Sequence, residues 1–205
     1  MRFNDLEPNL STLAIFNVND IRKIDPGFHR QQLYDWQQRG FIRPLAGGYY
    51  FLADQEVDET FLFSAANQLY MPSYISLESA LAYYQVIPES VLGVTSVSAR
   101  KTRRLDTAWG QFTYRSVKPA YMFGYEVVIP RSDQKFLIAS LEKAVLDYLY
   151  LNPHVQTIED FEGIRWNRTP LLPLTESALF NQYLMIFNKQ ALEHRVKLFM
   201  RYLDA

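Results

Sequence analysis

The segment Ala46-Gly47-Gly48 is the strongest constraint on how this chain can fold. It separates two strand-like runs, residues 41–45 and 49–53, and its glycines supply the backbone freedom that a tight hairpin requires. Gly40 stands directly before the first run and can close a preceding helix as its C′ residue. The sequence therefore predicts a two-stranded hairpin that directly follows a helix.

Three short helices are predicted before this hairpin. Apolar residues at helical spacing mark the first, over about residues 10–15, and the second, which contains Ile21. Asp25-Pro26 resembles an N-cap followed by proline at the first helical position, so we expect the third helix from about Pro26 to Arg39. Three helices and a ribbon in this order predict a winged helix-turn-helix domain in residues 1–55.

The third predicted helix has one polar face. On a helical wheel Leu33 and Trp36, with His29 beside them, define its buried side. Arginine and glutamine on the opposite face suit a helix in the major groove, where they hydrogen-bond to guanine and adenine. The hairpin would act as a wing that meets phosphates, whereas the alternative is an ordinary solvated helix face. The residues expected to contact DNA are Arg30, Gln31, Tyr34, Gln38, Arg43, Gly47 and Tyr49.

An acidic stretch, residues 54–59, marks the boundary of a second domain over residues 59–205. Helices are expected at residues 59–70, at 77–84 with Ser76 as the cap, and from Ser140 to before Pro153. Two further helices should open at Thr175 and Asn188. Alternating β-branched and aromatic residues predict a small antiparallel sheet. Its strands are expected at residues 94–99, 112–117, 121–129 and 136–138, which gives an α+β fold class.

A basic run follows the first of these strands. The chain has a net charge of −1, yet residues 100–135 hold eight bases and three acids, a local charge of +5. Such a run can neutralise phosphates at any DNA sequence, and its alternative is a solvated loop. The candidate phosphate contacts are Arg100, Lys101, Arg103 and Arg104.

The sequence contains no motif that marks a catalytic site. There is no cysteine, the three histidines are far apart, and no nucleotide-binding, nucleophile-elbow or zinc-protease motif occurs. Glu142 and Asp147 are about 140° apart on one helix and do not converge as an acid/base pair. We therefore expect no enzyme activity, no metal and no cofactor. The charged start of the chain and the lack of a long apolar stretch predict a soluble cytoplasmic protein.

Several segments resemble the AbiEi-like family of antitoxins and transcriptional regulators from bacterial abortive-infection systems. The resemblance covers roughly residues 15–155, and Gln85 stands where the family pattern has glycine. The most specific segment is PSYISLESALAYYQVIPE, residues 72–89. The others are Gly40-Phe41-Ile42, Gly48-Tyr49-Tyr50, residues 110–114, residues 123–125, and Glu142-Lys143-Ala144 with Asp147 and Tyr150.

This resemblance implies an N-terminal domain that represses its own operon by binding operator DNA. Separately from the resemblance, a homodimer on the DNA is one arrangement that stays open. It also implies a C-terminal domain needed for antitoxicity. The toxin would be a nucleotidyltransferase-like protein encoded alongside and countered without stable binding. Two other classes stay open: a module whose winged helix docks a protein, and a cryptic metal-dependent nuclease or transferase with scattered carboxylates.

Overall fold

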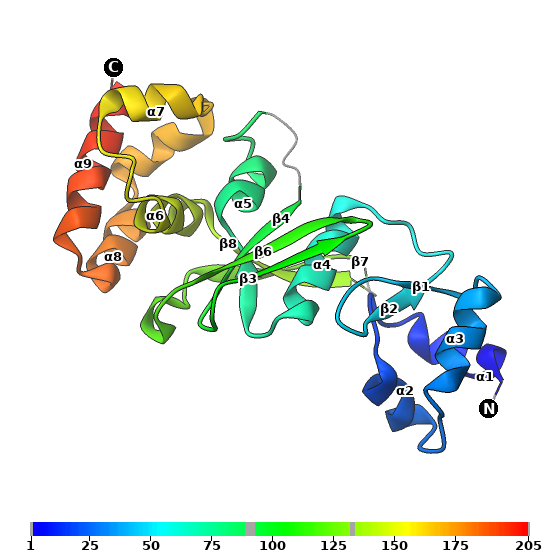
Figure 1. The fold of residues 1–205 in the computed structure, drawn as a ribbon. Helices are drawn as coiled ribbons and strands as arrows, with labels where there is room; N and C mark the ends of the chain where they lie inside the picture. The colour runs from blue at the N-terminus through cyan, green and yellow to red at the C-terminus, as the bar shows by residue number, and fades with distance from the viewer. Residues whose placement is uncertain (1, 89–92, 132–133, 205) are drawn as a thin grey trace.

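The structure, a computed structural model, describes residues 2–88, 93–131 and 134–204. Three helices and a hairpin lie at one end, a sheet occupies the middle, and the C-terminal helices lie at the other end (Figure 1). This mixture of helices and strands confirms the predicted α+β class and the C-terminal helices.

The N-terminal unit contains helices that differ from the predicted ones in their starts. The helices are α1 (Phe3–Leu10), α2 (Val18–Ile24) and α3 (Gln31–Gln38). The prediction that α3 starts at Pro26 was wrong, because Asp25 closes α2 instead. Its carboxylate accepts a hydrogen bond from the Gly27 amide and its carbonyl accepts one from Phe28. This turn directs Phe28 into the core.

The first helix lies earlier than its apolar spacing suggested. Phe3, Leu6 and Leu10 form its buried side. The Ser11 and Thr12 hydroxyls donate to the carbonyls of Pro8 and Asn9, one turn back. Because such side-chain bonds compete with the helical ladder, they end the helix before residues 13–15.

The hairpin consists of β1 (Ile42–Pro44) and β2 (Tyr50–Leu52), as predicted. Gly40, Gly47 and Gly48 all have positive φ angles, the region that favours glycine. A third segment joins the ribbon: Phe16 and Tyr50 exchange two backbone hydrogen bonds of 2.8 Å. The residue just before α2 is thereby tied to the hairpin.

The second unit is built on a six-stranded sheet with the order β5-β6-β4-β3-β8-β7. The prediction of a small antiparallel sheet was wrong, because β3–β8 and β4–β6 are parallel pairs. Two strands, β3 and β5, were also not expected, since one is very short and the other is rich in charge. The strands are β3 (Ser73–Ile75), β4 (Val94–Ser98), β5 (Arg103–Thr107), β6 (Gly110–Ser116), β7 (Tyr125–Arg131) and β8 (Gln134–Ala139).

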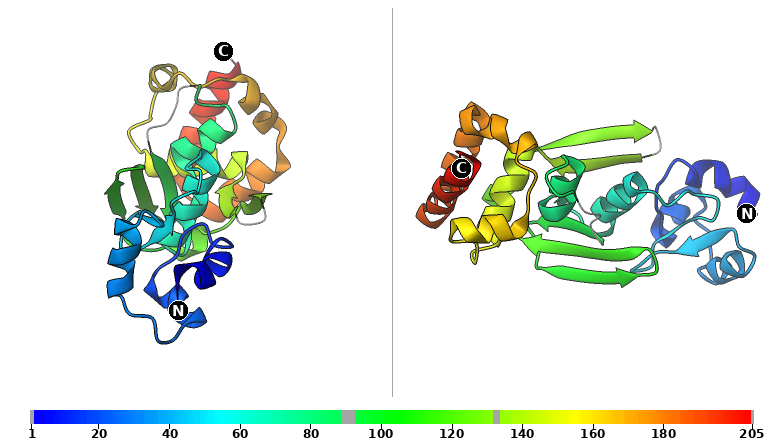
Figure 2. Two further views of the ribbon diagram at one scale, coloured as in Figure 1. Left: turned by 90° about the vertical axis from the view of Figure 1, so that its right-hand side faces the viewer. Right: turned by 90° about the horizontal axis from the view of Figure 1, so that it is seen from above.

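Helices cover both faces of this sheet (Figure 2). Tyr114 and Phe136 point to one face, where they contact α4 (Glu59–Leu69). Tyr74 and Arg115 share the opposite face through the register Tyr74↔Val97↔Arg115. Both hydrogen-bond to α6 (Leu141–Leu151). The helix α5 (Leu77–Tyr83) packs beside α6.

The two predicted C-terminal helices are present with shifted starts, and a helix and two 3₁₀ segments occur where none was expected. The remaining helices are α7 (Ile158–Ile164), α8 (Ala178–Phe187) and α9 (Gln190–Asp204), with 3₁₀ segments η1 (Pro119–Tyr121) and η2 (Thr169–Glu176). Helix α8 begins after Ser177, not at Thr175, because η2 occupies residues 169–176. Asn188 ends α8 in the left-handed region rather than opening α9. Gln85 also has φ +60°, which explains why a glycine suits that position. Glu89, the end of the most specific segment, lies outside the described residues.

Two buried apolar clusters correspond to the two ends of the chain. The smaller one holds the apolar sides of α1 to α3, among them Leu33 and Trp36, together with Ile42 and Leu52 of the hairpin. The larger one holds the sheet and the C-terminal helices, and it also includes Phe51 of the hairpin. Phe51 packs against Phe61 and Trp109 at ring-centroid distances of 5.0 and 5.4 Å. The hairpin therefore belongs to both cores.

Gly124 is a position where the fold should tolerate no side chain. Its φ is +68°, and a Cβ there would lie 2.8 Å from Tyr183 Cε2 and 3.2 Å from Lys143 Cβ. Gly124→Ala should therefore lower the free energy of unfolding by about 1–3 kcal/mol, measured by urea denaturation. Gly163→Ala is the matched control, since nothing lies within 4 Å of that Cβ and alanine favours its helix by up to about 1 kcal/mol. Equal stability of the two variants would contradict this packing.

Candidate functional site

The outer face of α3 carries the polar residues that the sequence predicted. Arg30, Gln31, Tyr34 and Gln38 are exposed, Tyr34 by 58%. Their side chains make no hydrogen bond to the described residues, and neither does exposed Asp35. Free amide, guanidinium and phenol groups on one helix face can all hydrogen-bond to base edges.

Aromatic packing fixes the inner face of α3. Trp36 contacts Phe3 and Phe28 at centroid distances of 5.0 and 5.1 Å. The prediction that His29 is buried was wrong: His29 is exposed, and Phe28 fills that place because α3 starts later. The orientation of α3 is therefore set by packing that leaves its polar face toward solvent.

A groove of about 430 Å³ lies between the start of α2, the start of α3 and the hairpin tip. It brings together three of the predicted residues, Arg30, Gly47 and Tyr49, and adds one that the sequence analysis missed, Arg22. Arg22 and Arg30 are both exposed cations on this groove. Backbone amides of the glycine tip and the Arg22 guanidinium can donate hydrogen bonds to phosphate oxygens, whereas Arg30 adjoins the polar face of α3.

The predicted role of Arg43 is corrected by the structure. Its side chain is half-buried, and its guanidinium lies over the rings of Phe51 and Trp109, 4.9 and 5.0 Å from their centroids. Nη2 donates to the carbonyls of Ala53 and Gln55. Arg43 therefore fastens the hairpin internally and does not face a phosphate.

The residues of the basic run contact different partners within the chain. Arg100 and Arg103 lie over the ring of Tyr70, 4.2 and 5.3 Å from its centroid, and Arg100 also donates to the Met71 carbonyl. Arg104 pairs with Asp106 at 3.3 Å on the surface. Lys101 is exposed and its side chain has no hydrogen-bond partner among the described residues. The run lies where β5 begins, whereas the turn after β5 docks on the hairpin through Trp109, which donates to Pro44. The structure therefore does not bring this run together with α3.

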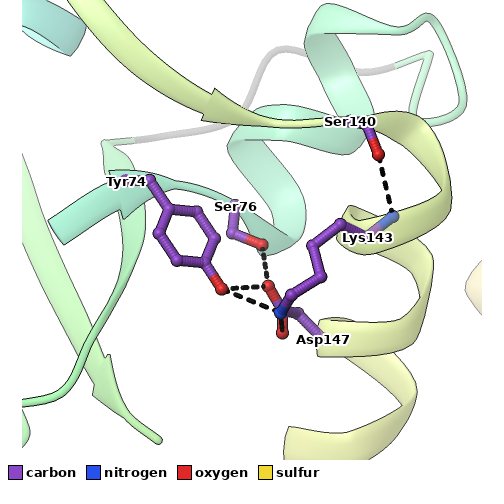
Figure 3. A network of polar contacts seen from close by, with 5 residues as sticks. All are labelled: Tyr74, Ser76, Ser140, Lys143 and Asp147. Atoms are coloured by element: carbon purple, nitrogen blue, oxygen red, sulfur yellow. Dashed lines mark hydrogen bonds and ion pairs between the residues drawn. The ribbon is translucent and has the colours of Figure 1, made fainter. Parts of the chain in front are cut away.

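A second polar constellation is completely buried, and the sequence analysis missed it. Lys143 and Asp147, one turn apart on α6, form an ion pair with both side chains at 0% exposure. Lys143 Nζ donates to Tyr74 Oη at 2.8 Å (Figure 3). Tyr74 and Ser76 donate to Asp147 Oδ2 at 2.8 and 2.9 Å. Ser76 is the N-cap residue of α5, as predicted, but its hydroxyl bonds to Asp147 and makes no cap hydrogen bond to the helix.

Burial sets the electrostatics of this network. Desolvation lowers the pKa of Lys143, and the charge and hydrogen bond of Asp147 act against it. The rings of Phe123 and Phe187, 4.8 and 4.9 Å from Nζ, add cation–π contacts. Desolvation also raises the pKa of Tyr74 well above its usual value, so its phenol stays protonated and can donate. With no exposed atom to meet a substrate, the network acts as a tie between β3 and α6.

One sequence signal could have revealed this tie. A lysine and an aspartate four residues apart lie on one helix face. Here the two charged residues flank the three apolar residues of the segment KAVLD. Two of the segments that carry the AbiEi resemblance each contribute two residues: Tyr74 and Ser76 come from one, and Lys143 and Asp147 come from the other. Their separation of about 70 residues in sequence hides the contact.

The comparisons with known proteins do not add a family to these observations. No protein-family model matches the chain. No curated protein matches it either. Among the described residues, no group of three or more His, Asp or Glu side chains could hold a metal ion. No described helix is long and apolar enough to span a membrane.

Removing one partner of the buried ion pair should strongly lower the free energy of unfolding. Lys143→Met leaves the Asp147 carboxylate buried without its cation, so we expect a loss of about 3–5 kcal/mol in the free energy of unfolding by urea denaturation. The double variant Lys143→Met/Asp147→Leu should recover part of this loss, since no unpaired charge stays behind. Lys197→Met, on the surface of α9, is the control and should change stability little. A double variant no more stable than Lys143→Met would contradict the pairing.

Proposed function

We propose that this chain is a non-enzymatic DNA-binding transcriptional regulator whose residues 1–55 act as a winged helix-turn-helix. The observation that carries the proposal is the free polar face of α3 beside the groove that Arg22, Arg30 and the glycine tip line. In this arrangement α3 enters the major groove of operator DNA, and the hairpin tip meets the flanking phosphates.

The contacts divide into two kinds. Gln31, Tyr34 and Gln38 on α3, with Arg30 at its start, read base edges, whereas Arg22, Gly47 and Tyr49 bind phosphates. The basic run of Arg100, Lys101, Arg103 and Arg104 enters the proposal only as a separate, sequence-independent phosphate surface. Lys101 is its strongest member because its ammonium has no partner among the described residues.

Binding to the DNA upstream of the chain's own reading frame tests this division. Arg30→Ala and Gln31→Ala should each cost about 1–3 kcal/mol on the specific site and relax its base preference, because each loses a base-edge contact. Arg22→Ala should weaken all DNA sequences alike and reduce the slope of log K against log salt by ~0.9. Fluorescence anisotropy at several salt concentrations measures both effects.

The control is Arg201→Ala, which removes the same charge from an exposed residue of α9 at the far end of the molecule (Figure 1). It should leave affinity and slope unchanged. DNA binding that Arg30→Ala/Gln31→Ala leaves intact would exclude α3 as the reader. A wild-type protein without salt-dependent DNA affinity would instead favour a protein-docking module.

The resemblance to AbiEi-like proteins extends the proposal to antitoxin activity in the second unit, residues 59–205. The support is that the network of Tyr74, Ser76, Lys143 and Asp147 gathers residues from two of the resembling segments at one place in this unit. In this proposal the cytoplasmic protein represses its own operon and counters a nucleotidyltransferase-like toxin without stable binding.

Co-expression with the product of the adjacent nucleotidyltransferase-like gene tests the antitoxin role. Wild-type protein should restore growth, and so should Arg30→Ala/Gln31→Ala, which loses only promoter repression because its substitutions lie outside the second unit. Growth and a promoter reporter are scored in the same cells. Failure of the wild-type protein to rescue growth would remove the antitoxin role, and rescue lost with the α3 variant would show that both functions share one surface.

A further inference from the structure

A cavity of about 420 Å³ lies where the large sheet splits. The described pairing of β3 with β8 consists of one position, Ile75 opposite Ile138. Beyond it, side chains of α4 take the hydrogen bonds that a neighbouring strand would make. Ser64 Oγ donates to the Lys135 carbonyl at 3.0 Å, and Asn67 Oδ1 accepts from the Leu137 amide at 2.6 Å. The strands can therefore diverge there without leaving these backbone groups unpaired.

The walls of this cavity are mainly apolar and flexible. They include Met71, Met122, Tyr125, Val127, Phe136 and Leu137. Met71 and Val127 are 63% and 59% exposed, which is unusual for large apolar side chains, so these two walls are not covered by the described residues. A volume in this range suits a small organic molecule rather than a folded element.

Two buried polar atoms of cavity-lining residues have no partner. Asn67 is 8% exposed and Ser73 is 3% exposed, yet Asn67 Nδ2 and Ser73 Oγ make no hydrogen bond to the described residues. Because Asn67 Oδ1 already accepts from Leu137, the free end of this amide is its donor. Buried polar groups in proteins are nearly always satisfied, so a hydrogen-bonding group of a ligand in the cavity is one partner that would satisfy these two atoms.

One charged residue, a lysine, is among the described residues that line the cavity. Lys135 lines it with an exposed side chain and forms no ion pair with a described residue. No Asp or Glu is among the lining residues that the structure describes. The Asn67 amide, the Ser73 hydroxyl and the Lys135 ammonium group are all hydrogen-bond donors. Together they favour a ligand with an anionic group whose oxygens accept two or three hydrogen bonds.

We propose that this cavity binds a small amphipathic carboxylate. Its hydrocarbon part packs against Met71, Met122 and Val127, and its carboxylate accepts from Asn67 Nδ2 and Ser73 Oγ and pairs with Lys135. Tyr125, another wall residue, is stacked on Tyr74 at 4.8 Å, so the ligand would touch a ring that rests on the buried network. This site is independent of the proposed DNA contacts.

Calorimetric titration of the full chain with octanoate and with neutral octanamide tests the site. We expect saturable binding of one octanoate per chain and at least tenfold weaker binding of octanamide. Lys135→Met should weaken octanoate about tenfold, the loss of one hydrogen bond to a charged group, and leave octanamide unchanged. Val127→Trp should fill the cavity and abolish both, whereas Ile129→Trp, also exposed on β7 but outside the cavity lining, should retain wild-type binding.

Circular dichroism and thermal unfolding confirm that each variant is folded. Absence of saturable octanoate binding to the wild-type protein would overturn the proposal, as would equal affinity for octanamide. Undiminished octanoate binding by a folded Val127→Trp variant would place the ligand elsewhere. A dimer that octanoate dissociates and Val127→Trp prevents would assign the cavity to a second copy of the chain instead.

Discussion

The buried ion pair of Lys143 and Asp147 is the interaction on which the second unit depends. A charge in a protein core is expensive unless every donor and acceptor around it is matched. Here the partners come from β3 and from α6 itself, and the rings of Phe123 and Phe187 approach from η1–β7 and α8. These segments can therefore adopt only the relative positions that satisfy the pair, and Gly124 allows the backbone to approach it closely.

The hairpin connects the proposed DNA-reading face to this unit. Phe51 lies in the larger core, Trp109 donates to the hairpin at Pro44, and the Arg43 guanidinium lies over both of their rings. A ribbon of two short strands is marginal by itself, so its position is determined by this docking.

Local sequence signals predicted most helices and the hairpin because the signals act within a few residues. Gly47 and Gly48 define the turn, and Ser140 caps α6 as expected by accepting from the Lys143 amide. The predicted helix boundaries were wrong where one residue type can either begin or end a helix. Asp25 can start one helix or end another, and Asn188 likewise ends α8, because each residue can bond to its own neighbours.

The sequence by itself determined the α+β class, the polar face of α3 and the apolar residues of the helices, since these follow from periodicity along the chain. Only the tertiary structure decided the mixed sheet order, the inward use of Arg43, the joining of Tyr74 and Ser76 to Lys143 and Asp147, and the cavity at the split between β3 and β8. Each of these depends on contacts between residues far apart in sequence, and side-chain periodicity carries no information about which distant segment will supply the partner.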